Sequence, residues 1–517
     1  MQEKPQDGRL DLWPLSRLIY NLIINRMEKK PSLVLSVFPI LVLVLLLVAG
    51  VKLFGEDLTS GPSQIALLTA GVIGALIGIF YLKIPWKKID SQIADNLQKT
   101  GSALFILLMI GSLTASWIQS GVVPALIYYG LKLISPSVFL LVTFLFTAII
   151  STMAGSSWTT IGTIGVAMLS AGEILGFHSG WLAGAIISGA YFGDKVSPLS
   201  DTTNLSASVS QVDLYKHVRY SLITNVPLLV ITALIFTIAG FMIPSANNLD
   251  IEKDLAEISA AYNITPWLLL IPGATIYMIY KKVSPFLTLF LSAIIGCVVA
   301  LFAQPQIIAQ ITPFAADSAK TWLYAPLKIM SSHVEISTGN EMLDGLVSTD
   351  GMSGMLNTIW LILCVVAFGG IMEACGFIQK ITDIVVSRIK SVVSLVASTM
   401  TSCILCNIVL SDQYMSILLS GKIFKNLYEE EGYDPVLLSR SLQDSAAVTS
   451  VLVPWNTCGV VQAGVLGVPT LEYIPYCFYN WLSPIVNLLV VCTGYKVYQF
   501  GKPIGRIFGK KREVGTK

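Results

Sequence analysis

The sequence has few charged residues and almost no histidine. Asp, Glu, Lys and Arg together make up 12% of the 517 residues, and only three residues are histidine. A soluble globular domain carries about 25% charged residues, so the composition excludes that class. Hydrophobic residues make up 54% of the chain, and runs such as 33–51 are long enough to cross a hydrocarbon core of about 30 Å. The chain is therefore predicted to be an integral membrane protein.

The motifs of common enzyme and metal chemistry are also missing. No HExxH, GxSxG or Walker A pattern occurs, and the histidines are far apart. All eight cysteines lie at or after Cys297, and the CxxC at Cys403 and Cys406 has no further ligands near it. We therefore interpret the cysteines as small core residues. We expect no enzymatic activity and no cofactor.

Apolar segments recur along the chain and predict an all-α polytopic membrane protein with about twelve membrane segments, because backbone groups in lipid must be satisfied within each segment. Narrow apolar stripes among basic residues predict surface helices before residue 33 and over 86–99. The predicted units are 1–100, an N-terminal surface helix, two spans and a cytoplasmic surface helix; 101–218, a first repeat; 219–304, connecting spans; 305–355, an external loop region with little regular structure; 356–500, a second repeat; and 501–517, a basic tail.

The basic residues cluster at the ends of apolar segments. We interpret them as topology markers and expect no nucleic-acid partner. Clusters at 26–30, 83–88 and 510–512 are assigned to the cytoplasm, and the acidic residues of 250–257 and 305–355 to the outside. Both termini are therefore predicted to be cytoplasmic.

Residues 193–204 place charges, hydroxyls, an amide and a proline in an otherwise apolar region. A carboxylate within a bilayer costs about 2.5 to 3.5 kcal/mol on insertion scales, so these acids need a partner or a role. Carboxylate, hydroxyl and carbonyl oxygens are ligands of small hard cations, and we expect Na⁺ at Asp194 and Asp201. The candidate ligands in this stretch are Asp194, Ser197, Ser200, Asp201, Thr202, Thr203 and Asn204.

Lys195 lies between the two acids in the sequence. Its ammonium is a candidate charge partner that neutralises one acid while the site is empty and leaves when a cation enters. Two structural alternatives stay open. Lys195 and Asp194 could form only a buried ion pair, and Asp201 could cap a helix that starts at Thr202.

The second half of the chain repeats the first at an offset of 256 residues (454 − 198). Residues 155–165 parallel 411–421, and Pro198 corresponds to Pro454. A proline within a helix frees a carbonyl, and irregular backbone at membrane depth is tolerated only beside a buried or wet cavity, so the two prolines predict helix breaks at the site. The repeat adds the candidates Ser156, Asp412, Asn456 and Thr457, with Glu373 and Asp444 as further intramembrane acids. The hydroxyls after Gly155 could instead bond to their own helix.

The charge rule predicts opposite orientations for the two copies. The first copy starts with a span that runs outward from Lys99, whereas the second starts after the acidic loop and runs inward toward Lys380. Inverted-topology repeats are typical of secondary transporters, which bind substrate and ions near the midplane between interrupted helices. We therefore predict a secondary carrier whose site lies between the breaks at Pro198 and Pro454.

Burial of neighbouring carboxylates favours proton binding by one of them. If that acid must release its proton before Na⁺ binds, the two ions compete for one site, and alternating access exchanges them. The alternative cargo is an organic acid or amino acid. Its carboxylate would need a Lys or Arg at membrane depth, and Lys195 is the candidate.

Three stretches resemble the signature motifs of NhaC-type Na⁺/H⁺ antiporters. They are GSSWTTIGTIG at 155–165, GDKVSPLSDTTN at 193–204 and VPWNTCG at 453–459. The resemblance covers roughly residues 30–500 and implies a bacterial inner-membrane carrier of the ion transporter superfamily, with inverted repeats and discontinuous helices. The Asp and Thr positions of that family carry over to Asp194, Asp201, Thr202 and Thr203.

The transported ions implied by the resemblance are Na⁺ and H⁺. Li⁺ is a further candidate, and so is an organic anion, because the family includes sodium-lactate/malate-proton antiporters. The sequence leaves a homodimer open.

Overall fold

The computed structural model describes residues 30–54, 61–133, 135–243, 248–315, 318–337, 348–386 and 389–503. The predicted surface helix before residue 33 and nearly all of the basic tail lie outside this part of the chain. The fold is all-α, with one two-stranded hairpin near the C-terminus formed by β1 (Tyr498–Gln499) and β2 (Lys502–Pro503). The predicted fold class is confirmed.

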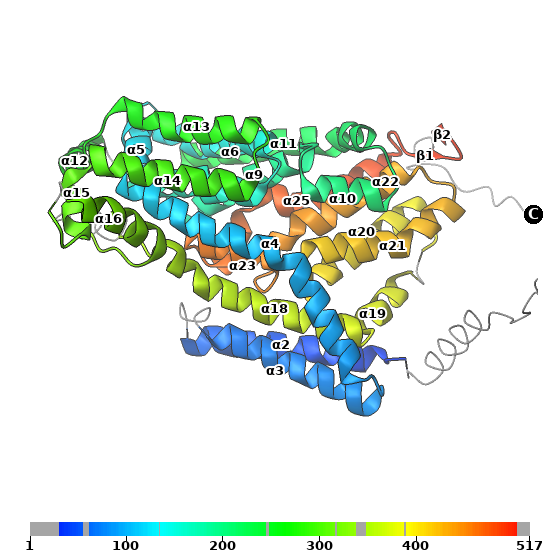
Figure 1. The fold of residues 1–517 in the computed structure, drawn as a ribbon. Helices are drawn as coiled ribbons and strands as arrows, with labels where there is room; N and C mark the ends of the chain where they lie inside the picture. Colours follow the sequence, from blue (N-terminus) through cyan, green and yellow to red (C-terminus); the bar gives the residue numbers. More distant parts are fainter. Residues whose placement is uncertain are drawn as a thin grey trace, which may run out of the picture.

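The N-terminal helices are α2 (Leu33–Phe54), α3 (Pro62–Leu76) with the π-helical turn η2 (Ile77–Tyr81), and α4 (Trp86–Gln119). Helices α2 and α3 lie along one edge of the bundle, and α4 runs from that edge across the bundle to α14 (Pro285–Ala303) (Figure 1). The predicted surface helix over 86–99 and the following span are a single helix, because no proline interrupts this segment. Its 34 residues span about 51 Å at 1.5 Å per residue, so α4 is much longer than a hydrocarbon core.

The first repeat contains two interrupted segments. Its elements are α5 (Val122–Leu133), α6 (Pro136–Ala154), α7 (Ser157–Thr160), the π-helical η3 (Ile161–Gly165), α8 (Val166–Ile174), α9 (Ser179–Val196) and α10 (Asp201–Val209). We call the turn at 155–156 the first corner and the residues 197–200 the first break. The break predicted at Pro198 is confirmed.

The second repeat has the same order of elements. They are α18 (Leu356–Ala374), α19 (Phe377–Val386), α20 (Val392–Val409), α21 (Gln413–Glu430), α22 (Pro435–Leu442), the π-helical η6 (Gln443–Ala447), the 3-10 turn η7 (Ser450–Leu452) and α23 (Thr457–Leu466). We call the turn at 410–412 the second corner and 453–456 the second break. The break predicted at Pro454 is confirmed.

The remaining helices connect and flank the two repeats. They are α11 (Leu214–Met242), α12 (Asn248–Ala261), η4 (Pro266–Leu269), α13 (Leu270–Tyr280), α14 (Pro285–Ala303), α15 (Pro305–Ile311), α16 (Ala319–Ser331), η5 (Gly351–Met355), α24 (Thr470–Tyr473), η8 (Ile474–Tyr476) and α25 (Phe478–Thr493). The prediction of little regular structure over 305–355 is wrong, since α15, α16 and η5 lie in this region. Pro305 opens α15 and Ser318 caps α16. These two helix-start signals were overlooked because the Gly and Ser residues of the segment suggested loops.

Among the described residues, eight helices are long and apolar enough to cross a membrane. A ninth is reached if the bent pair Thr470–Tyr476 and Phe478–Thr493 counts as one span. The number of twelve membrane segments therefore stays a prediction. Helices α9, α21 and the segment from α22 to α23 are absent from this set because polar residues or breaks interrupt them. The same polar residues make these helices the candidates for binding ions.

The structure extends the repeat beyond the sequence motifs. Helices α6 and α20 start 256 residues apart (392 − 136), and so do α9 and α22 (435 − 179). Each corner contains a residue with a positive φ, 65° at Gly155 and 58° at Ser411. Equivalent positions also make equivalent contacts: the Ser151 hydroxyl donates to the Ala190 carbonyl at 2.5 Å, and the Asn407 amide donates to the Ala446 carbonyl at 2.8 Å. The two halves are therefore copies of one helical scaffold, and their inverted orientation stays a prediction.

The tightest helix pair in the first repeat is α6 with α9. Gly189 and Gly193 of α9 face α6, where a Cβ atom would meet the backbone oxygens of Phe144 and Ala148 respectively. Small residues spaced four apart allow helix backbones to approach closely in membranes. This contact holds α9, and with it the first break, against the first corner.

A side chain at Gly189 should therefore destabilise the protein. Overpacking of this kind costs about 1 to 3 kcal/mol, so the Gly189→Val variant should show a lower apparent Tm in detergent than the wild type. Gly130 has nothing within 4 Å of its would-be Cβ and offers the matched control, Gly130→Val. Equal Tm values for the two variants would contradict the close α6–α9 contact.

Candidate ion-binding site

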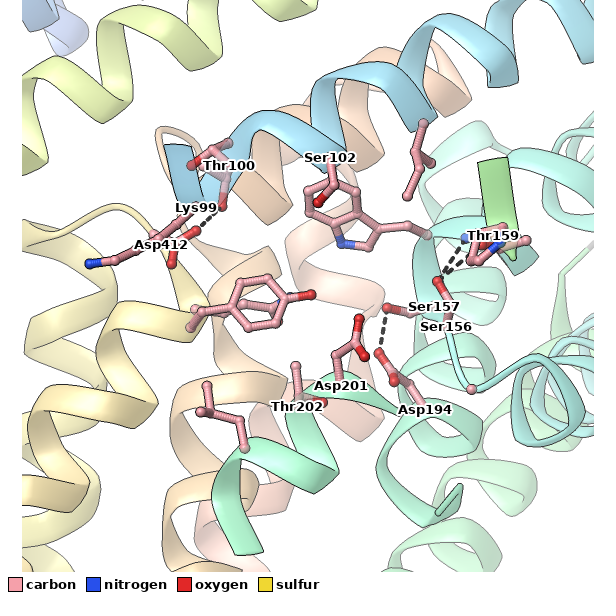
Figure 2. Close-up of a pocket in the computed structure, with 18 of the residues that line it drawn as sticks. Lys99, Thr100, Ser102, Ser156, Ser157, Thr159, Asp194, Asp201, Thr202 and Asp412 are labelled. Atoms are coloured by element: carbon pink, nitrogen blue, oxygen red, sulfur yellow. Dashed lines mark hydrogen bonds between the residues drawn. The ribbon is translucent and has the colours of Figure 1, made fainter. Parts of the chain in front are cut away.

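A cavity of about 720 Å³ lies between the two corners, the first break and the start of α23. Both halves line it: Ser156 and Asp194 come from the first repeat, and Asp412 and Thr457 from the second. Figure 2 shows Asp194, Asp201 and Ser157 on one side and Asp412 with Lys99 on the other. The structure thus brings together residues that are more than two hundred positions apart in the chain.

The first-half side of the cavity holds two carboxylates. Asp194 lies in the last turn of α9 with only 8% of its surface exposed, and the Ser157 hydroxyl donates to its Oδ2 at 2.8 Å. Asp201 begins α10 and is exposed to the cavity. Ser200 caps α10, because its hydroxyl accepts from the Thr203 amide at 3.3 Å. The Asp201 carboxylate is therefore not the helix cap and stays available to a ligand.

The other polar side chains at and just after the first break form hydrogen bonds with backbone groups. The Ser197 hydroxyl accepts from the Leu199 amide at 3.2 Å, and Asn204 donates to the carbonyls of Pro198 and Ser200 at 3.1 and 2.8 Å. The Thr203 hydroxyl donates to the Asp194 carbonyl at 3.1 Å. Among these predicted ligands, Thr202 lines the cavity, whereas Ser197, Thr203 and Asn204 do not.

The second-half side holds one carboxylate in a more crowded setting. Asp412 caps α21 by accepting from the Met415 amide at 2.9 Å, and its other oxygen accepts from the Thr457 hydroxyl at 3.2 Å. The Ser411 hydroxyl is buried without a hydrogen-bond partner in the described part of the chain and belongs to the lining. Asn456 is buried behind the cavity and is not part of the lining.

The second break is tied to its corner, and the first break is not. The Trp455 indole donates to the Ile408 carbonyl at 2.8 Å, and the Asn456 amide donates to the Asn407 carbonyl at 3.0 Å. The Thr457 backbone amide donates to the Ser411 carbonyl at 2.8 Å. Within the described residues, no equivalent hydrogen bond joins the first break to the end of α6; Gly155 packs against Leu199 instead.

Lys195 does not pair with the acids of the cavity. It is 2% exposed, forms an ion pair with Asp444 and donates to the Ser483 hydroxyl at 3.0 Å. The predicted pairing with Asp194 is therefore wrong, because Cα–Cβ directions of successive helix residues diverge and send the two side chains to different faces of α9. The Asp444 carboxylate also accepts from Thr224 at 3.1 Å, away from the cavity.

The second further acid, Glu373, also lies outside the lining. Its Oε2 accepts from Asn96 of α4 at 3.4 Å.

Ser157 is one of the hydroxyls after Gly155 for which the sequence left a direct role and a bond to its own helix as alternatives, and in the structure it donates to Asp194. This contact corresponds, 256 residues later, to the contact between Gln413 and Ser450 at 3.4 Å.

Two lysines at the cavity were missed from the sequence. The lysines Lys99 and Lys282 also line the cavity. Lys99 was assigned to the boundary between two elements, and only the continuity of α4 places it at the site.

The comparisons with known proteins agree with this architecture. The sequence profile of the Na⁺/H⁺ antiporter family matches residues 189–495. The chain is 35% identical over 436 residues to the Na⁺/H⁺ antiporter NhaC of Alkalihalophilus pseudofirmus, covering 84% of this chain and 90% of that protein.

Two other relatives differ in their cargo. One is the malate-2H⁺/Na⁺-lactate antiporter of Bacillus subtilis, at 36% identity over 84% of this chain and 89% of that protein. The other is the arginine/ornithine antiporter ArcD of Halobacterium salinarum, at 33% identity over 91% of this chain and 94% of that protein. With the profile match over residues 189–495 and these relatives over most of its length, the chain belongs to the Na⁺/H⁺ antiporter family.

Proposed function

We propose that the protein exchanges Na⁺ for H⁺ across a bacterial inner membrane by alternating access, with both termini in the cytoplasm. The observation that carries the proposal is the cavity between the breaks, which gathers Asp194, Asp201 and Asp412 from both repeats. Carboxylates with hydroxyl neighbours are suitable ligands for a small hard cation. The relatives named as Na⁺/H⁺ antiporters support the same ions.

In this mechanism, Asp194 and Asp201 bind either Na⁺ or a proton. The Ser157 hydroxyl, which donates to Asp194 at 2.8 Å, fixes the orientation of that carboxylate and leaves its other oxygen for the cation. Thr202 and Ser156 line the same side and offer hydroxyl oxygens. Because neighbouring carboxylates resist simultaneous ionisation, the empty site takes up a proton, and Na⁺ must displace it.

The present conformation faces the cytoplasm under the proposed topology. Asn96, Lys99 and Lys282 line the cavity, and Lys99 and Lys282 stand at segment ends that the positive-inside rule assigns to the cytoplasm. The first break is the part that moves, since the second is held to its corner through Trp455, Asn456 and Thr457.

A second candidate function is the exchange of an organic acid or amino acid coupled to Na⁺ or H⁺. The observation that favours it is the size of the cavity, about 720 Å³, which exceeds what a bare cation needs. The malate/lactate and arginine/ornithine relatives support it. Lys195 is unavailable for a substrate carboxylate, so this function would depend on the cavity lysines instead.

Transport in proteoliposomes with an internal pH-sensitive dye separates the two functions. Addition of Na⁺ should dissipate an imposed pH gradient without any organic solute, and Li⁺ is to be tested in parallel. A gradient that collapses only when malate, lactate or arginine is supplied would instead establish the second function.

Neutralising a cavity acid should abolish the exchange. Asp194→Asn and Asp201→Asn each replace a carboxylate ligand of Na⁺ by a neutral amide, which is a poorer ligand. We expect less than about 1% of wild-type activity, which corresponds to a loss of transition-state stabilisation of about 2.7 kcal/mol or more. Asp90 is an exposed acid on α4 away from the cavity, so Asp90→Asn is the matched control. Normal Na⁺-driven proton movement in Asp201→Asn would remove that residue from the site.

The proposed difference between the breaks predicts different accessibility changes. Leu199 and Leu418 both line the cavity, one at the mobile break and the other on α21. In single-cysteine variants, the rate of labelling by a membrane-impermeant maleimide should respond to Na⁺ at Leu199→Cys and stay constant at Leu418→Cys. The opposite pattern would mean that the second repeat moves.

A further inference from the structure

Lys99 is a charged group of the cavity that the exchange mechanism above does not use. It projects from α4 into the lining, and the polar contact of its ammonium is the Met415 thioether at 3.5 Å. A thioether sulfur is a weak acceptor, so the ammonium has no strong partner among the described residues. An ammonium in such a position is free to swing toward a nearby carboxylate.

A candidate partner in the same lining is Asp412. Met415 links the two, because its backbone amide donates to Asp412 at 2.9 Å and its sulfur contacts Lys99. Figure 2 shows Lys99 and Asp412 at the same end of the cavity. Asn96, one helical turn before Lys99 on α4, donates to Glu373 of α18, so the charge of Lys99 acts on Glu373 as well as on Asp412.

The other charged groups around Lys99 do not replace this pairing. Glu373 already accepts from Asn96 at 3.4 Å, lies near Lys422 as well, and stands outside the lining. Lys282, the second lysine of the lining, comes from the turn between α13 and α14. Lys195 is committed to Asp444. Lys99 is thus the ammonium placed to compete for the second-half acid.

We propose that Lys99 is a tethered counter-cation: it neutralises Asp412 while the cavity holds no transported cation, and Na⁺ displaces it on binding. The proposal rests on the Na⁺/H⁺ exchange proposed above. It assigns to Lys99 the role that the sequence suggested for Lys195, and to Asp412 a part in cation selection. A resident ammonium sets a threshold, because a cation must outcompete it before the cavity is loaded.

Removing the ammonium should therefore strengthen Na⁺ binding. An exposed ion pair is worth about 0.2 to 1 kcal/mol, so Lys99→Gln should lower the KM for Na⁺ by up to about fivefold, whereas Lys99→Arg should keep it near the wild-type value. Lys87→Gln removes the same charge from an exposed position of α4 outside the lining and is the matched control, with a KM unchanged within about twofold. The measurement is Na⁺-driven proton movement in proteoliposomes at several Na⁺ concentrations.

Chemical rescue tests the charge directly. Seven described cysteines are buried and Cys492 is partly so, which leaves Lys99→Cys as the accessible thiol. Its reaction with 2-aminoethyl methanethiosulfonate forms a disulfide that ends in an ammonium and should restore the wild-type KM. The 2-sulfonatoethyl reagent, which adds a negative charge, should not. Wild-type protein treated with each reagent controls for reaction at the native cysteines.

The outcomes separate this proposal from the exchange itself. If the wild type moves protons in response to Na⁺ and Lys99→Gln has the same KM, Lys99 is only an interfacial lysine and the proposal fails while the exchange stands. Failure of the aminoethyl reagent to restore the KM of Lys99→Cys would overturn it as well. Absence of Na⁺-driven proton movement in the wild type would instead refute the exchange.

Discussion

The backbone groups at helix ends in the middle of the molecule are the constraint on which the site depends. Each interrupted helix leaves unpaired carbonyls and amides, and lipid offers them no partner. In the second repeat, Trp455 and Asn456 donate to the last carbonyls of α20. In the first, Asn204 donates to Pro198 and Ser200. Most of the polar residues near the breaks are therefore used by the backbone, and only the remainder is available to ions.

The two repeats place different chemistry on the same scaffold. Position 156 is serine in the first copy and its counterpart 412 is aspartate, whereas Asp201 corresponds to Thr457. The acid and the hydroxyl have exchanged places between copies. In the second copy the pair closes on itself at 3.2 Å, and in the first it leaves the Asp201 carboxylate exposed to the cavity. The scaffold is thus symmetric in backbone and asymmetric in charge: the first copy leaves a carboxylate open to the cavity, and the second ties its carboxylate to the backbone and to Thr457.

The sequence predicted the helix breaks well, since proline removes a helix hydrogen bond and both copies carry one at the same register, among polar residues. It also predicted which acids reach the cavity in Asp194, Asp201 and Asp412. It failed where the answer depends on side-chain direction. Lys195 and Asp194 are neighbours in sequence, but burial of Lys195 against Asp444 follows from the packing of α9 on α25 and η6, which no local pattern contains.

The length of α4 was missed for a different reason. A change from a polar to an apolar surface suggested two helices, yet neither proline nor a cap separates them, and propensity then favours continuation. The same error hid Lys99, because a lysine at the presumed edge of a span was taken only as a topology marker. Helix continuity places it one turn from Asn96 and against Met415 of α21, in the cavity lining.

The charges that line the cavity explain why exchange should be coupled. Three carboxylates, Asp194, Asp201 and Asp412, face two ammonium groups, Lys99 and Lys282. With all of them ionised, the lining carries one negative charge in excess. An unbalanced charge is strongly disfavoured in a low-dielectric, closed site, whereas one bound Na⁺ or one bound proton makes the lining neutral. A cavity of this composition therefore closes readily when loaded with either ion and resists closure when empty, which is the condition that an exchanger must meet.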